Sequence, residues 1–228
     1  FIIVDIHRRM TMLRTQSMIL EGITEDIKEL FASDAGGHDY DHTMRVYKMA
    51  MMIAREEHAR EFIVGIAALL HDADDYKVSP DTEKTHDNAV RIMKKYGISD
   101  VQTENICRII EQVSFSGRDS VVPDTLEGKI VQDADRLDAM GAIGIARAFA
   151  YGGSHHRKIF DPAETYRADL SKEEYRNSQS STIGHFYEKL LLLKDMMNTS
   201  TGKIIAQHRH DFMEMFLDEF DAEWEGRI

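Results

Sequence analysis

Four polar residues directly after an apolar stretch have the side chains of a metal site. The stretch from Phe62 to Leu70 is almost entirely apolar, and it ends at His71-Asp72, with Asp74 and Asp75 close behind. An apolar run of that length is expected to be a buried helix, so the residues at its end begin inside the protein. Ionisable groups at that depth are costly unless they are paired or bound to a metal. We therefore interpret His71-Asp72 as metal ligands; the alternative is an ordinary buried helix with a polar end.

A second histidine lies on the apolar face of the preceding helical pattern. His42, Val46, Met49 and Ile53 recur at the spacing of one helix face, within a helix predicted over residues 40–58. A histidine in such a stripe is more often a core residue than a ligand. Arg45 favours a functional site, because it shares the face of His42 and would otherwise be an unexplained buried charge.

Periodicity also separates the carboxylates of a long helical pattern over residues 123–150. Val131, Asp135 and Asp138 share one stripe. Asp133 lies two residues from Asp135, which is roughly 200° around a helix. Only one of these two aspartates can therefore face a common site. We assign that place to Asp135 and predict that Asp133 belongs to a solvated acidic face.

A helical bundle can gather four of these side chains at one point: His42, His71, Asp72 and Asp135. Two imidazoles and two carboxylates suit divalent manganese, iron, cobalt or nickel, and magnesium less clearly. Four protein ligands leave octahedral positions open for water and a substrate oxygen, as catalysis requires. We therefore expect a divalent cofactor, with Mn²⁺ favoured over Mg²⁺, Co²⁺, Ni²⁺ and Fe²⁺.

The composition predicts an acidic, helical, cytoplasmic protein. The 228 residues include 3 Pro and 14 Gly against 13 Met, which favours helix. Lys and Arg number 28 against 40 Asp and Glu, and the resulting net charge of −12 argues against nucleic acid or an anionic membrane as partner. Cys107 is the single cysteine, which fits a reducing compartment. We see neither a membrane span nor a signal peptide.

We predict one helical domain over residues 21–228, preceded by an extension or peripheral segment over residues 1–20. Further helices are predicted over residues 21–32, 82–96, 98–113, 183–197 and 203–224. Residues 152–181 are poor in apolar side chains and carry Gly152-Gly153 and the basic cluster His155–Lys158. Long loops in a compact domain are often lids or disordered segments. We predict a mobile cover with the glycine pair as its hinge; a solvated loop is the alternative.

The ordered set of candidate ligands resembles the signature of the HD-domain metal-dependent phosphohydrolase superfamily. That signature is a histidine, a His-Asp pair at a helix end, and an aspartate in a later helix. Leu69-Leu70 before the pair and Ala134–Leu137 around the last aspartate make the resemblance specific. It is closest to a small bacterial branch of nucleotide pyrophosphohydrolases and extends over about residues 36–226. That branch often has lysine where this chain has Ser116.

The resemblance implies an all-α helical bundle that binds its metal through the four candidate ligands. It also implies hydrolysis of nucleoside triphosphates, including deoxy forms, to monophosphate and pyrophosphate by a metal-activated water. The expected partner is a small phosphorylated molecule, most readily a nucleotide, and the sequence permits a homodimer.

Further roles are assigned around the metal ligands. Asp75, three residues beyond Asp72, is the candidate for orienting or deprotonating the water. Arg45, Lys77 and Arg136 are candidates for neutralising phosphates, a task for which arginine is well shaped. For Lys77 and Arg136 the alternative is a surface ion pair. The remaining expected substrate contacts are Asp138, Arg157, Lys158 and His38.

Three other functions use some of the same residues. His38 and His42 have the spacing of a metalloprotease motif, but Gly36-Gly37 places His38 at or before the helix start, and Asp39 stands where glutamate is expected. A nucleotide sensor without activity would have lost a ligand, whereas all four positions are filled. A 5′-nucleotidase or phosphodiesterase is the main alternative, since the same metal centre serves these cleavages.

Overall fold

The computed structural model describes residues 2–32, 39–74, 85–113, 120–167, 173–174 and 180–227, with side chains from residue 10 onward. Within these residues the fold is all-α, as predicted, and contains no strand. The helices are α1 (Ile2–Leu30), α2 (Tyr40–Glu56), α3 (Glu61–Leu70), α4 (Asp87–Lys95), α5 (Asp100–Val113), α6 (Leu126–Asp138), α7 (Gly141–Ser154), α9 (Thr182–Glu188), the 3₁₀ helix η1 (Leu190–Met196) and α10 (Ser200–Trp224).

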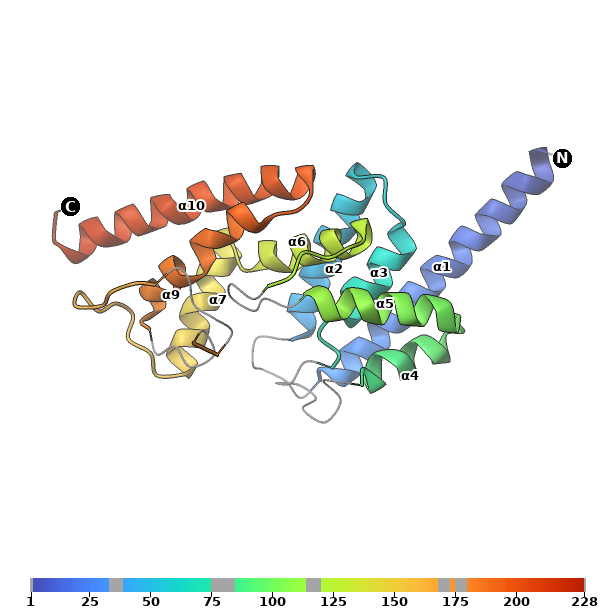
Figure 1. Cartoon of the computed structure of the whole chain (residues 1–228), viewed down its shortest axis with the longest axis horizontal. Helices are drawn as coiled ribbons and strands as arrows, with labels where there is room; N and C mark the ends of the chain where they lie inside the picture. Colours follow the sequence, from blue (N-terminus) through green and yellow to red (C-terminus); the bar gives the residue numbers. More distant parts are fainter. Residues whose placement is uncertain are drawn as a thin grey trace.

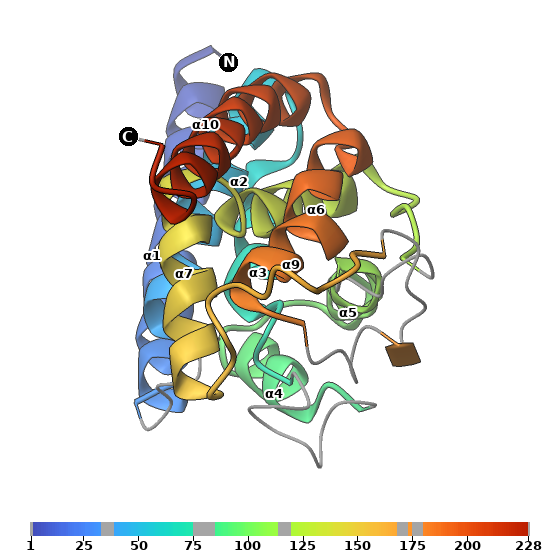
Figure 2. The same cartoon turned by 90° about the vertical axis from the view of Figure 1, so that its left-hand side faces the viewer.

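Helices α2, α3 and α6 form the centre of the bundle. α2 packs against both α3 and α6, and α6 also contacts α5 and α10. Figure 1 shows α1, α4 and α5 on one side of this centre and α7, α9 and α10 on the other. In Figure 2 the view is turned so that α7 and α10 lie in front. The chain thus surrounds α6 with both its early and its late helices.

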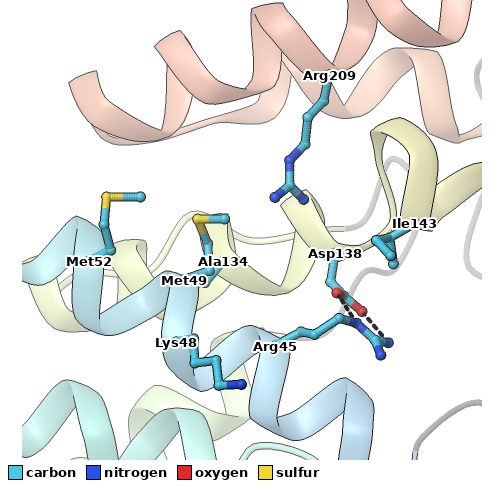
Figure 3. A pocket seen from close by; sticks show the side chains of 8 residues that line it. All are labelled: Arg45, Lys48, Met49, Met52, Ala134, Asp138, Ile143 and Arg209. Carbon is cyan, nitrogen blue, oxygen red and sulfur yellow. Dashed lines mark hydrogen bonds and ion pairs between the residues drawn. The ribbon is translucent and has the colours of Figure 1, made fainter.

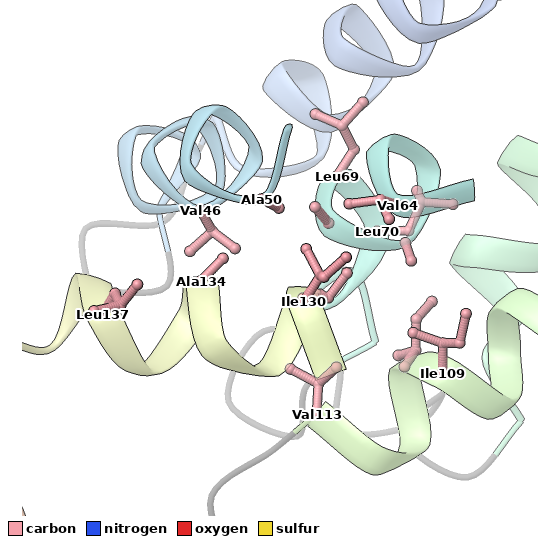
Figure 4. Close-up of a cluster of buried hydrophobic side chains, with 14 of the residues drawn as sticks. Val46, Ala50, Val64, Leu69, Leu70, Ile109, Val113, Ile130, Ala134 and Leu137 are labelled. Atoms are coloured by element: carbon pink, nitrogen blue, oxygen red, sulfur yellow. The ribbon is translucent and has the colours of Figure 1, made fainter. Parts of the chain in front are cut away.

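Helix α3 is buried on all sides, as its sequence predicted. Every residue from Ile63 to Leu70 is buried. Val46 and Ala50 of α2 and Ile130 of α6 pack around this helix (Figure 4). A helix that is apolar all round belongs in the interior. The residues that follow it, His71 and Asp72, are consequently 6% exposed each.

The first helix is longer than its apolar pattern indicated. It begins at Ile2, and its N-terminal half projects from the bundle (Figure 1). Ile23 and Ile27 are fully buried against the core, whereas Met10 and Met18 are 65% and 64% exposed. In the described part of the chain no helix is long and apolar enough to cross a membrane.

The predicted long helix over residues 123–150 is in fact two helices, because the chain turns between α6 and α7. Gly141 adopts a φ of +68°, a conformation that glycine reaches without steric cost. A Cβ atom at this position would lie 3.1 Å from the Cγ of Arg209. The apolar spacing continues across the turn, so periodicity alone gave no sign of it.

The predicted glycine hinge is wrong, because Gly152 and Gly153 lie inside α7. The described residues that follow are held against α9: the carbonyls of Lys158 and Ile159 accept hydrogen bonds from the backbone N–H groups of Thr182 and Ile183 at 2.9 and 3.0 Å. This part of the expected cover is therefore fixed to the bundle rather than hinged.

Candidate metal centre

The first candidate ligand is positioned by the N-terminus of α2. The side chain of Asp39 caps the helix by accepting a hydrogen bond from the backbone N–H of His42 at 2.7 Å. This is a helix-capping contact, and it gives Asp39 a structural role. The His42 ring is 1% exposed, and its Nδ1 lies 2.7 Å from Oδ2 of Asp138. Because that carboxylate accepts a hydrogen bond, Nδ1 carries the proton and Nε2 presents a lone pair.

The second and third candidate ligands are positioned by the turn at the end of α3. Nδ1 of His71 donates to the carbonyl of Ala68 at 2.8 Å, which leaves Nε2 of His71 with a free lone pair. The buried side chain of Asp74 accepts hydrogen bonds from the backbone N–H groups of Asn88 and Ala89 at the start of α4. These bonds fix the turn that carries Asp72.

Three of the candidate ligands, His42, His71 and Asp72, form a cluster that could hold a metal ion, and Asp135 approaches both histidines. Nε2 of His42 lies 3.3 Å from Nε2 of His71, 3.3 Å from Oδ2 of Asp72 and 3.4 Å from Oδ1 of Asp135. Nε2 of His71 lies 3.4 and 3.8 Å from the same two carboxylate oxygens. Adjacent ligands of an ion bound at about 2.0–2.2 Å lie roughly 2.8–3.1 Å apart in octahedral geometry and roughly 3.3–3.6 Å apart in tetrahedral geometry. The spacing of the donor atoms therefore fits a divalent metal ion.

The electrostatics of the cluster favour a positive charge at this point. Burial opposes charge on His42, but its hydrogen bonds to Asp135, Asp138 and Asp72 outweigh burial and raise its pKa well above the usual value. Burial also opposes ionisation of Asp135, yet the bond to His42 and the charge of His71 lower its pKa. The carboxylates beside the two imidazoles therefore favour a cation at this point, either a proton on the imidazole or a metal ion between the donor atoms. The donor set thus fits a metal by charge as well as by spacing.

Asp138 lies behind the cluster and hydrogen-bonds to a candidate ligand. Its oxygens accept hydrogen bonds from Nε and Nη2 of Arg45 at 2.7 and 3.1 Å and from Nη1 of Arg147 at 2.6 Å, in addition to the bond with His42. Burial opposes its ionisation, but the bonds from His42 and Arg45 keep its pKa below the usual range. Its bond to His42 is an orienting contact on a candidate ligand, the arrangement common behind metal-bound histidines. The part of Asp138 in substrate binding stays a prediction.

Arg147 is a functional candidate that sequence reasoning missed. It lies on α7, beyond the turn that ends α6, so helical periodicity could not place it beside Asp138. The only available signal was its place within residues 36–226, the span that resembles the phosphohydrolase branch. The side chains of Arg45 and Arg147 remain 34% and 30% exposed, so both can still meet a ligand from solvent.

Arg136 does not meet the cluster. Its side chain is 4% exposed, and Nη1 donates to the carbonyl of Met196 at the end of η1. Burial lowers its pKa, and the charges of Asp133 and Asp135 only partly compensate. Neither the predicted phosphate contact nor the alternative surface ion pair fits these contacts. Arg136 instead ties α6 to η1.

Asp133 and Asp135 face different sides of α6, as the helical phase predicted. The prediction of a solvated face for Asp133 is wrong, because Asp133 is 0% exposed. Its carboxylate accepts hydrogen bonds from the backbone N–H groups of Asn198 and Thr199 at 2.9 and 2.8 Å, and from Oγ1 of Thr199 at 2.7 Å. Asp133 therefore fixes the start of α10 on α6.

The basic cluster after α7 is held by local contacts. The guanidinium of Arg157 lies 5.4 Å from the centre of the Tyr151 ring, and Nζ of Lys158 lies 2.7 Å from Oδ2 of Asp161. The part of Arg157 and Lys158 in substrate binding stays a prediction. The other expected contributors, His38, Asp75 and Lys77, lie outside the described residues, as does Ser116, the position where the branch often has lysine.

Beside this basic cluster, His185 makes stability depend on pH. Burial, together with the charges of Lys189 and Arg157, lowers the pKa of His185 to about 3. An unfolded histidine has a pKa of about 6.5, so the unfolded chain binds more protons between these values. The free energy of unfolding should therefore fall by up to about 2 kcal/mol between pH 6.5 and pH 5. In His185→Gln, which cannot take up this proton, we expect a shallower fall. Urea unfolding of both proteins at several pH values measures this change in the free energy of unfolding. An equal change with pH in both proteins would contradict the role of His185.

Comparison with known proteins places this site in a family. The HD domain family model matches residues 39–140, a range that contains all four candidate ligands. The chain is 36% identical over 209 residues to YpgQ of Bacillus subtilis, covering 90% of this chain and 94% of YpgQ. The crystal structure of YpgQ in complex with ADP has a TM-score of 0.74 with this structure.

Two further crystal structures extend the comparison. A Lactobacillus plantarum protein has a TM-score of 0.81 and 39% identity, covering 91% of this chain and 97% of its own. An HD-superfamily hydrolase from Bacillus thuringiensis has a TM-score of 0.74 and 37% identity, covering 92% of this chain and 98% of its own. The matches span nearly the whole length of each protein. The chain therefore belongs to the HD superfamily of hydrolases.

Proposed function

We propose that this protein hydrolyses nucleoside triphosphates, including deoxy forms, to monophosphate and pyrophosphate with a metal-activated water. The observation that carries the proposal is the convergence of two imidazole nitrogens and two carboxylate oxygens within 3.3–3.8 Å along the measured pairs. Asp135 is the most open of these groups, with a side chain 24% exposed, so a substrate can approach from its side. The ADP complex of YpgQ supports a nucleotide as ligand.

When bound, a divalent ion at this site lowers the pKa of a coordinated water and polarises a phosphoryl oxygen. The ligands would be His42, His71, Asp72 and Asp135. Mn²⁺ is the favoured ion, because a mixed nitrogen and oxygen donor set suits it; Mg²⁺, Co²⁺, Ni²⁺ and Fe²⁺ are the alternatives.

The rest of the mechanism lies with residues around the ligands. Asp138 keeps Nδ1 of His42 protonated and its ring oriented. Arg45 and Arg147 place two guanidinium groups beside Asp138, where their exposed edges can neutralise phosphate oxygens. Asp75 is our candidate for orienting the attacking water, with Lys77 and His38 near the phosphates. We place this reaction in the cytoplasm.

A product analysis tests the proposal. The purified protein is incubated with a panel of ribo- and deoxyribonucleoside triphosphates, monophosphates and cyclic nucleotides in the presence of Mn²⁺. We expect monophosphate and pyrophosphate from the triphosphates. Orthophosphate and nucleoside would indicate a 5′-nucleotidase instead, and opening of the cyclic nucleotides a phosphodiesterase. Binding of nucleotide and metal without any product would leave the protein a sensor and refute the proposal.

A further inference from the structure

A pocket of 290 Å³ borders Asp138 (Figure 3). Helices α2, α6, α7 and α10 enclose it, and its polar lining consists of Arg45, Lys48, Asp138 and Arg209. Met49 and Met52 line it from α2. The pocket thus joins cationic groups to an apolar wall.

The pocket is separate from the metal cluster, although the two share a boundary. None of the four candidate ligands lines it. His42 presents Nε2 to the cluster and Nδ1 to Asp138, and the Asp138 carboxylate in turn borders the pocket. The His42 ring and Asp138 therefore stand between the two sites. A ligand in the pocket would touch residues that orient a metal ligand without touching the metal.

The lining carries an excess of positive charge in a protein whose net charge is −12. Three cations border the pocket against one carboxylate, and that carboxylate already accepts hydrogen bonds from His42, Arg45 and Arg147. Within the residues that the structure describes, Lys48 and Arg209 form no ion pair. Arg209 donates to the carbonyl of Leu137, and its guanidinium reaches into the pocket from α10. Arg209 is partly buried, where a cation without a carboxylate partner is costly, whereas Lys48 is exposed to solvent. An anion in the pocket would compensate Arg209 and could also bind Lys48.

The apolar side of the pocket indicates which chemical group is attached to the anion. Methionine thioethers pack well against aromatic rings and adapt to flat ligands. Known ligand pockets span about 300–1,000 Å³. This pocket, at 290 Å³, lies just below that range, which limits its ligand to a small molecule. We propose that the pocket is a second anion site, distinct from the metal cluster, for an organic phosphate with a flat apolar body, of the size of a nucleoside monophosphate. The phosphate would bind Lys48 and Arg209, and the apolar body would lie against Met49 and Met52.

Calorimetric titration of the 228-residue chain with AMP tests this second site. The Asp72→Ala variant removes the competing metal site, and we expect it to retain one AMP site. On that background Lys48→Ala should weaken AMP binding about tenfold, because a charge-assisted hydrogen bond to phosphate is lost. Met52→Trp should abolish binding by filling the pocket. Lys203→Ala is the matched control, because Lys203 is an exposed lysine of α10 outside the lining, and it should bind AMP unchanged.

Two results would overturn the proposal. One is the loss of all AMP binding in Asp72→Ala, because the nucleotide would then use only the metal cluster. The other is unchanged binding in both Lys48→Ala and Met52→Trp. Ribose 5-phosphate, which lacks the base, should bind more weakly than AMP, and equal affinity would refute the role of the methionine wall. These titrations measure no hydrolysis, so failure of the proposed reaction would leave their outcome untouched.

Discussion

His71→Ala and Asp72→Ala should each purify without bound metal and lose hydrolytic activity by more than about 100-fold. Even residues that only orient a metal ligand contribute about 10–100-fold to metal affinity or activity, so loss of a ligand should cost more. Both side chains face the point of convergence, with Nε2 of His71 3.4 Å from Oδ2 of Asp72. Elemental analysis gives the metal content, and circular dichroism should show unchanged helical content.

The matched control for these variants is Asp195→Ala. Asp195 is an exposed aspartate on η1, so this change should preserve both the metal and the activity. Stoichiometric metal in His71→Ala and in Asp72→Ala would show that these residues are not ligands.

Asp133→Ala and Asp135→Ala should fail in opposite ways, although the two residues are neighbours on α6. Asp135→Ala should lose metal and turnover by more than about 100-fold, with little change in the free energy of unfolding. Asp133→Ala should keep the metal but lose about 3 kcal/mol of stability, because the buried N–H groups of Asn198 and Thr199 lose their acceptor. Urea unfolding and elemental analysis of both variants separate the two effects.

Gly202→Ala should disturb the same contacts of the Asp133 carboxylate, this time from α10. The added Cβ atom would lie 2.5 Å from Oδ2 of Asp133, so this variant should also lose stability and keep its metal. If Asp133→Ala instead lost the metal while unfolding like the wild type, the assignment of the two aspartates would have to be exchanged.

The sequence predicted those parts of the fold and site that depend on one helix at a time. The buried position of α3 follows from its continuous apolar run, and the opposite faces of Asp133 and Asp135 follow from the helical repeat. What lies opposite each face does not follow from either. The partner of Arg136 is 60 residues away in the chain, and Arg209 is 72 residues from the carbonyl it contacts. Periodicity carries no information about such distant contacts.

Sequence reasoning missed Arg147 and misplaced Asp133 for the same reason. Arg147 reaches Asp138 only because the chain turns at Gly141, and the apolar spacing that predicted one long helix passes over that turn. A solvated face for Asp133 was a reasonable prediction for an aspartate without a visible partner. Only the arrival of α10 supplies the N–H groups that make its burial favourable.

The attachment of α10 to α6 bears on whether the segment matched by the family model is an autonomous folding unit. That segment ends at residue 140, yet Asp133 and Arg136 take their hydrogen-bond partners from residues 196–199. Excised at residue 140, the chain would lose these hydrogen bonds and expose to water the side of α6 that packs against α10, which would destabilise the helix that carries Asp135. The last third of the chain supplies none of the candidate ligands, yet α6, the helix that carries Asp135, depends on it for stability.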